Sequence, residues 1–220
     1  MSVPRIIIVG ADSGGVGKTT VSRVLLDYFI AKGVALRAFD TEAPTGNLKR
    51  FYPEKTTVVD LTRSDDQMKI FDTLKTAAVT VIDLRAGLLS KTLRMLSEIG
   101  FLNVEGKLAI SLLHVLGSTA VSFAEITATA KLVAGAKHFL VLNHINNASY
   151  LGLTDELKNS GSGIFEVDKL NELAAEHVDR ASIGFDHFCR IDGSAVLQGY
   201  VRSWRNRIFK QFDDVKFNEV

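Results

Sequence analysis

The chain has 220 residues, of which 46% are hydrophobic and 23% charged, and its formal net charge is +1. This composition is typical of a folded globular protein, and so small a net charge excludes a global field that would recruit nucleic acid or an anionic membrane. A single cysteine, Cys189, excludes an internal disulfide and favours a reducing compartment. No run approaches the ~20 apolar residues of a membrane-spanning helix, so we expect a soluble, cytoplasmic protein that does not bind membranes.

The first two elements enclose a glycine-rich segment. A continuous Ile/Val run over residues 5–10 predicts a buried strand of a parallel sheet, and apolar residues at helical spacing over 19–32 predict a helix. Glycines between them allow backbone N–H groups to turn towards phosphate oxygens, and the N-terminus of the helix favours an anion. The segment predicted to bind phosphate comprises Gly14, Gly15, Val16, Gly17, Lys18, Thr19 and Thr20.

Two side chains of this loop have expected roles. Lys18 can reach the β- and γ-phosphates of a nucleotide, and the Thr19 hydroxyl can ligate Mg²⁺. The general phosphate-loop pattern begins with a glycine at the position where this chain has Asp12, whereas the tighter pattern from Gly14 to Thr20 is complete.

The remaining segments alternate between strand and helix patterns. Strands are predicted at 34–39, 57–61, 79–82, 108–115, 138–142 and 164–167, and helices at 65–77 (capped by Ser64), 91–99, 119–133, 167–180 and 195–212. We expect residues 43–55 to be a mobile loop and residues 146–163 to be a connecting segment. Repeated βα units predict one nucleotide-binding domain over 1–220, a three-layer α/β fold with a mostly parallel sheet covered by helices on both faces. Its ligands should bind at the carboxyl ends of the strands.

Three polar residues end predicted strands at this edge. Asp83 follows an apolar run, as a Walker B acid does, and would hold Mg²⁺ through its water shell beside Thr19. Asp40 is placed to orient or activate an attacking water, with Glu42 as a second candidate. The Asn143 amide can donate and accept together at an adenine edge.

On these residues the chain resembles the ParA/MinD family of deviant Walker A ATPases, which are P-loop proteins similar to the nitrogenase iron protein. The resemblance covers about the first two-thirds of the chain and is carried by four segments: 13–20, 40–47, the strand end at Asp83, and 140–143. It implies an Mg²⁺-ATP-binding switch ATPase with Lys18 and Asp40 as catalytic residues and Asn143 at the adenine. It also implies a nucleotide-dependent homodimer, a protein partner, and a role in plasmid or chromosome partitioning, conjugative transfer or protein positioning. Non-specific DNA is a further expected partner.

The chain departs from the family at three places. Ser13 stands where the family has a signature lysine that reaches the partner's phosphates, and this predicts slow hydrolysis unless another cation substitutes. Arg85 is the candidate, because it follows Asp83 closely and replaces the proline of the usual Asp-x-Pro. The segment that begins at Asp40 is also one residue longer than the family pattern.

Two other functions remain open for the same scaffold. One is an ATP-dependent small-molecule carboxylase or amidoligase, and the other is a nucleotide-binding scaffold that does not hydrolyse ATP. The last predicted helix carries an apolar stripe and a separate basic face, which indicates core packing, a DNA contact or an interfacial helix. The basic residues of that face are Arg202, Arg205, Arg207 and Lys210. The five histidines show no spacing typical of a metal site.

Overall fold

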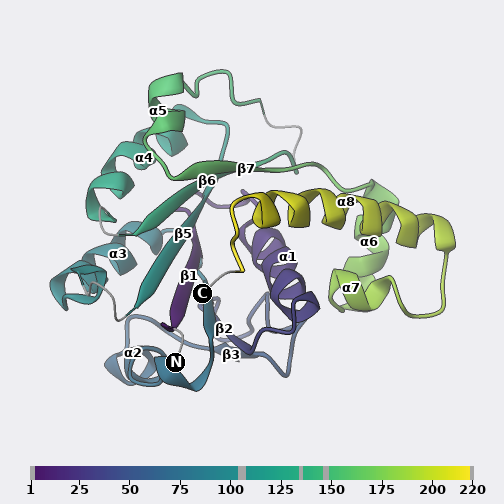
Figure 1. The fold of residues 1–220 in the computed structure, drawn as a ribbon, viewed down its shortest axis with the longest axis horizontal. Coiled ribbons are helices and arrows are strands. Elements are labelled where there is room, and N and C mark those ends of the chain that lie inside the picture. Colours follow the sequence, from purple (N-terminus) through teal and green to yellow (C-terminus); the bar gives the residue numbers. More distant parts are fainter. Residues whose placement is uncertain (1–2, 104–107, 134–135, 146–148, 219–220) are drawn as a thin grey trace.

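A computed structural model of the chain describes residues 3–103, 108–133, 136–145 and 149–218. Seven strands form one sheet in the order β3-β2-β4-β1-β5-β6-β7, and every neighbouring pair is parallel (Figure 1). The strands are β1 (Arg5–Gly10), β2 (Leu36–Asp40), β3 (Thr56–Val58), β4 (Val79–Asp83), β5 (Ala109–Leu116), β6 (Lys137–Asn143) and β7 (Gly163–Val167). The predicted three-layer α/β fold is therefore confirmed, and its sheet is parallel throughout.

Helices cover both faces of this sheet (Figure 1). One face is covered by α1 (Lys18–Ala31), α6 (Glu172–Ala181), α7 (Phe185–Phe188) and α8 (Ala195–Asp214). The other is covered by α2 (Ser64–Phe71), α3 (Leu89–Glu98), α4 (Ala120–Leu132) and α5 (Asp155–Asn159). Short 3₁₀ turns, η1 (Leu74–Thr76) and η2 (Phe101–Asn103), follow α2 and α3. In the part of the chain that the structure describes, every helix is too short or too polar to cross a membrane.

The position of β1 in the middle of the sheet explains its run of apolar residues. Successive side chains of a strand point to opposite faces. Ile7 and Val9 pack with α1 and α8, while Ile6 and Ile8 pack with α2 and α3. All four are fully buried, because both faces of the strand are covered.

The C-terminal helix α8 packs through the predicted apolar stripe. Its buried residues are Leu197, Val201, Trp204, Ile208 and Phe212. Three cations of its basic face are paired with carboxylates, Arg205 with Asp186, Arg207 with Asp168 and Lys210 with Asp214. This arrangement agrees with a core-packing helix whose polar face is solvated.

Several predicted boundaries are wrong. The helix predicted over 65–77 begins at Ser64 and ends at Phe71, and its N-cap is Arg63 rather than Ser64. The helix predicted over 167–180 begins at Glu172, because Val167 pairs within β7 and the Asn171 side chain caps the helix by accepting from the Ala174 N–H. The connecting segment contains α5, and its residues 146–148 lie outside the described residues.

The segment 43–55 is packed rather than mobile. Leu48, Phe51 and Tyr52 are buried in the cluster around α1. The Tyr52 hydroxyl also donates to Asp27 of α1 over 2.9 Å. The apolar side chains at 48, 51 and 52 follow helical spacing and explain why this loop adheres to the helix.

Candidate functional site

The glycine-rich segment forms a loop between β1 and α1 whose shape depends on glycine. Gly15 and Gly17 have φ values of +71° and +87°, a region that side chains with a Cβ rarely adopt. Gly17 is the N-cap residue of α1, and its position leaves the first turn with neither a side-chain cap nor an acidic residue. The first backbone N–H groups of α1 are therefore available to an anion.

Lys18 lies across the loop. Its Nζ donates to the Ser13 carbonyl oxygen over 2.9 Å. Burial lowers the pKa of this ammonium, and the negative charges of Asp83, Glu42, Glu125 and Asp12 oppose that shift. Lys18 is thus a cation with four acids nearby, held by the Ser13 carbonyl oxygen of the loop.

Thr19 and Asp83 lie next to each other. The Thr19 hydroxyl donates to Asp83 Oδ2 over 2.9 Å, while Asp83 Oδ1 is buried and has no hydrogen-bond partner among the described residues. Burial, together with the nearby Asp40, raises the pKa of Asp83 to about 7. A hydroxyl beside an unsatisfied carboxylate oxygen fits the donor set that Mg²⁺ prefers.

A cavity of about 290 Å³ opens over these residues. Its lining includes the loop and the strand-end residues that the sequence singled out: Gly15, Gly17, Lys18, Thr19, Thr20, Asp40, Glu42, Asn47, Asp83 and Arg85. The sheet register explains this convergence, because Val9 pairs with Asp83 and Asp83 with Asp40 across β1, β4 and β2.

Asp40 has a structural role in the loop that follows it. Its Oδ1 accepts from the Glu42 N–H over 2.9 Å, and its Oδ2 accepts from the Leu48 and Lys49 N–H groups over 2.6 and 3.1 Å. The carboxylate is 1% exposed but still lines the cavity. Both of its oxygens therefore hold the loop at the edge of the predicted phosphate site.

The two loops that flank the cavity are joined by Thr41. Its hydroxyl donates to the Asp83 carbonyl over 3.2 Å and accepts from the Arg85 N–H over 2.7 Å. Arg85 itself is exposed and lines the cavity. The segment that follows Asp40 also contacts α6, through an ion pair between Arg50 and Asp179.

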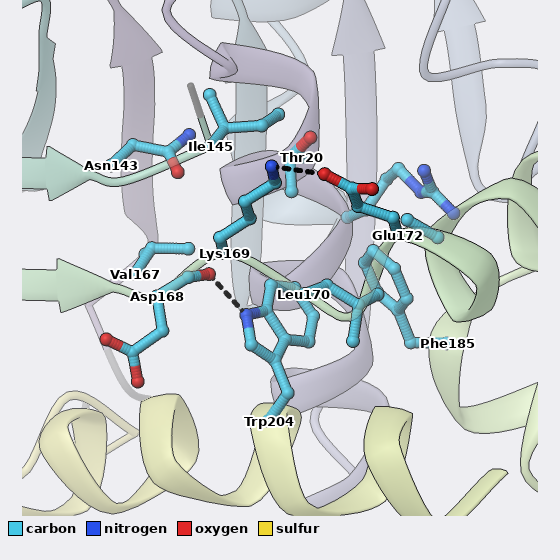
Figure 2. A pocket seen from close by; sticks show the side chains of 12 residues that line it. Thr20, Asn143, Ile145, Val167, Asp168, Lys169, Leu170, Glu172, Phe185 and Trp204 are labelled. Carbon is cyan, nitrogen blue, oxygen red and sulfur yellow. Dashed lines mark hydrogen bonds and ion pairs between the residues drawn. The ribbon is translucent and has the colours of Figure 1, made fainter. Parts of the chain in front are cut away.

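A second cavity, of about 250 Å³, lies on the other side of Thr20 and is mostly apolar. Figure 2 shows Asn143 at its left edge, Phe185 at its right and Trp204 of α8 below. Asn143 Nδ2 donates to the Val16 carbonyl over 3.0 Å, and its buried Oδ1 has no partner among the described residues. Thr20 lines both cavities, so they lie on either side of this residue.

Sequence reasoning missed Glu125 of α4. This carboxylate accepts from the Asp12 N–H over 3.3 Å and from the Ser13 hydroxyl over 3.2 Å. It also lies 3.6 Å from His114 Nε2. Glu125 lies 113 positions from Asp12 and 112 from Ser13 in the chain, so no local motif could have joined it to the loop.

Several solved structures share this fold. A plasmid partition protein from Borrelia burgdorferi aligns with a TM-score of 0.56 and 14% identity, over 97% of this chain and 99% of that one. MinD cell division protein from Aquifex aeolicus aligns with a TM-score of 0.54 and 10% identity, over 91% and 96%. A nucleotide-binding protein from Archaeoglobus fulgidus, solved in complex with ADP, aligns with a TM-score of 0.54 and 17% identity, over 82% and 87%.

The chain has the P-loop NTPase fold. No protein-family model matches the sequence, and no curated protein matches it either. At identities of 10–17% the likeness extends to the fold, and the function has to be argued from this chain's own residues.

Proposed function

We propose that the protein is an Mg²⁺-ATP-binding switch ATPase of the ParA/MinD type. The observation that carries this proposal is the Thr19–Asp83 pair at 2.9 Å, beside the uncapped first turn of α1 and the Lys18 ammonium. Backbone N–H groups and one lysine would hold the β- and γ-phosphates. Thr19 and Asp83 would hold Mg²⁺, which neutralises charge between those phosphates when it is bound.

The second cavity, beside Asn143, would hold the nucleotide base, and its lining favours adenine. Asn143 Nδ2 is committed to the Val16 carbonyl, so its amide keeps Oδ1 as the free group. An acceptor there pairs with the exocyclic amino group of adenine, whereas guanine presents a carbonyl at that position. The apolar walls formed by Leu170, Phe185 and Trp204 suit a stacked base (Figure 2).

The catalytic assignments follow from position in the cavity. Asp40 would orient the attacking water, although its hydrogen bonds to the loop make it a rigid and deeply buried group for that task. Arg85 would supply, within the same chain, the cation that Ser13 does not. Hydrolysis by such a site should be slow, because among the residues that the structure describes Lys18 is the only other lysine or arginine that lines the cavity.

The proposed switch is the segment between Asp40 and Tyr52. Glu42 and Asn47 of this segment line the phosphate cavity, while Arg50 and Tyr52 contact α6 and α1. A terminal phosphate that moves the end of the segment near Glu42 and Asn47 would therefore also shift its contacts with α6 and α1. We propose that this change controls a homodimer or a protein partner in partitioning, conjugative transfer or protein positioning.

The test combines binding with molar mass. Wild type and Lys18→Ala are titrated with Mg²⁺-ATP, Mg²⁺-ADP and Mg²⁺-GTP, and light scattering then measures the mass in each state. We expect wild type to bind ATP, Lys18→Ala to lose at least about tenfold in affinity, and ATP alone to produce a dimer. Wild type that binds no nucleotide would overturn the proposal. Binding without a change of mass or hydrolysis would support the non-hydrolysing scaffold instead.

A further inference from the structure

The N-terminal half of the glycine-rich loop is held from outside by a half-buried acid. Glu125 projects from α4, and its side chain is 13% exposed. One carboxylate oxygen accepts from the Asp12 N–H over 3.3 Å and the other accepts from the Ser13 hydroxyl over 3.2 Å. Hydrogen bonds to an ionised acceptor are stronger than neutral ones, so this side chain restrains two consecutive residues of the loop.

Two buried histidines lie beside the carboxylate. His114 Nε2 lies 3.6 Å from Glu125, and His114 Nδ1 lies 3.3 Å from His138 Nε2. Their rings stack with centroids 5.5 Å apart. Burial lowers the pKa of His138 to about 4, so this imidazole is neutral at physiological pH.

His114 Nε2 lies near the carboxylate but beyond hydrogen-bond distance, and it has no hydrogen-bond partner among the described residues. An N–H at this atom, and not a lone pair, suits a neighbouring carboxylate. His138 Nδ1 likewise has no hydrogen-bond partner among the described residues. The histidine pair therefore packs beside Glu125, whose hydrogen bonds go to the loop.

Ser13 connects Glu125 to Lys18. Its hydroxyl donates to Glu125, and its carbonyl oxygen accepts from Lys18 Nζ over 2.9 Å. Ser13 is thus bonded on both sides, by an acid of α4 and by Lys18, which lines the cavity over the glycine-rich loop. A shift of Glu125 would move the carbonyl that sets the resting position of Lys18.

We propose that Glu125 is a positioning residue for nucleotide binding: it fixes Ser13, and through Ser13 it places Lys18 for the β-phosphate. This inference rests on the proposed nucleotide-binding function. ADP and ATP both carry a β-phosphate, so loss of Glu125 should weaken both to the same extent. This distinguishes it from a residue that contacts the terminal phosphate, which affects ATP alone.

The test is a double-mutant cycle with Ser13→Ala and Glu125→Gln, in which the dissociation constants of Mg²⁺-ADP and Mg²⁺-ATP are measured. Each single variant should bind both nucleotides about tenfold more weakly, as expected for the loss of a charge-assisted hydrogen bond. The double variant should be no weaker than the weaker single variant, because the two residues act as one unit. Ser13→Thr, which keeps a hydroxyl, should bind close to wild type.

Glu98→Gln on α3 is the matched control, since Glu98 is exposed and lies outside the loop contacts. Melting temperatures of all variants separate loss of fold from loss of positioning. Additive losses in the cycle, or a loss confined to ATP, would overturn the inference while leaving nucleotide binding intact. Wild type that binds neither ADP nor ATP would overturn the proposed function itself.

Discussion

Thr19 and Asp83 are hydrogen-bonded at 2.9 Å although 64 positions separate them in the chain. Thr19 lies in the first turn of α1 and Asp83 ends β4, which is the parallel neighbour of β1. The sheet therefore brings the two proposed metal ligands together without help from the loop between them. The buried carboxylate is costly in this position, and that cost can be measured.

Asp83→Asn should stabilise the protein in the absence of nucleotide and metal. Because the pKa of Asp83 is raised to about 7, the folded state keeps a proton that the unfolded state loses above about pH 4. Wild-type stability therefore falls as pH rises from about 4 to about 7, by up to about 4 kcal/mol. Asparagine carries no such penalty and still accepts from Thr19.

Denaturant unfolding at pH 5 and pH 8 checks this expectation. The unfolding free energy of the variant should exceed that of wild type by more at pH 8 than at pH 5. Mg²⁺ should raise the nucleotide affinity of wild type but not that of the variant. An equal difference in unfolding free energy at the two pH values would mean that Asp83 is ionised in the fold throughout this range.

Asn143→Ala should remove base selectivity. Wild type is expected to prefer ATP over GTP by about tenfold or more, because the free Oδ1 favours the adenine amino group and an unpaired polar group costs ~1–3 kcal/mol. The variant should bind the two nucleotides with similar affinity. Competition titrations measure the ratio, and Asn47→Ala, which alters the phosphate cavity instead, should leave it unchanged. A variant that retained the preference would assign base recognition to other residues.

The parts of the fold that could be predicted from sequence are those encoded locally. A short, continuous apolar run between turn signals favours a strand covered on both faces, and two such runs end in residues of the candidate site, β4 at Asp83 and β6 at Asn143. Parallel strands place these ends at one edge. The candidate site therefore followed from strand ends together with one glycine-rich loop.

The contacts that sequence reasoning missed are non-local. The Glu125–Ser13 hydrogen bond spans 112 positions, and the stacked His114–His138 pair depends on the register between β5 and β6. The segment 43–55 looked mobile because of its prolines, yet Tyr52 holds it to α1 through Asp27. Such contacts depend on packing between elements, which periodicity does not describe.

Gly17→Ala should disrupt the site through a steric contact as well as through strain. A Cβ at Gly17 would lie 2.1 Å from Asn143 Nδ2, so the amide would have to leave the Val16 carbonyl. Gly33→Ala is the matched control, since Gly33 has a similar positive φ of +67° and nothing within 4 Å of its Cβ position. We expect Gly33→Ala to cost about 1 kcal/mol of stability and Gly17→Ala about 2–4 kcal/mol, with loss of nucleotide binding only in the latter. Equal costs in thermal unfolding would argue against the close packing of Gly17 on Asn143.

Arg85→Ala tests whether this chain supplies its own cation to the terminal phosphate. Arg85 lines the phosphate cavity, and its backbone is fixed by the 2.7 Å hydrogen bond from its N–H to Thr41. The guanidinium can therefore reach a γ-phosphate from a rigid base. We expect ATP affinity to fall by about tenfold and ADP affinity to remain unchanged, because a charge-assisted hydrogen bond to the γ-phosphate is lost only with ATP.

Arg85→Lys should recover part of the loss, since it keeps the charge but not the bidentate geometry. Arg94→Ala, at an exposed position on α3, serves as the control and should leave both nucleotides unaffected. Isothermal titration with a non-hydrolysable ATP analogue and with ADP gives the two constants directly. If Arg85→Ala weakened ADP as strongly as the analogue, the arginine would act on the shape of the loop and not on the terminal phosphate. The missing cation would then have to come from a second chain.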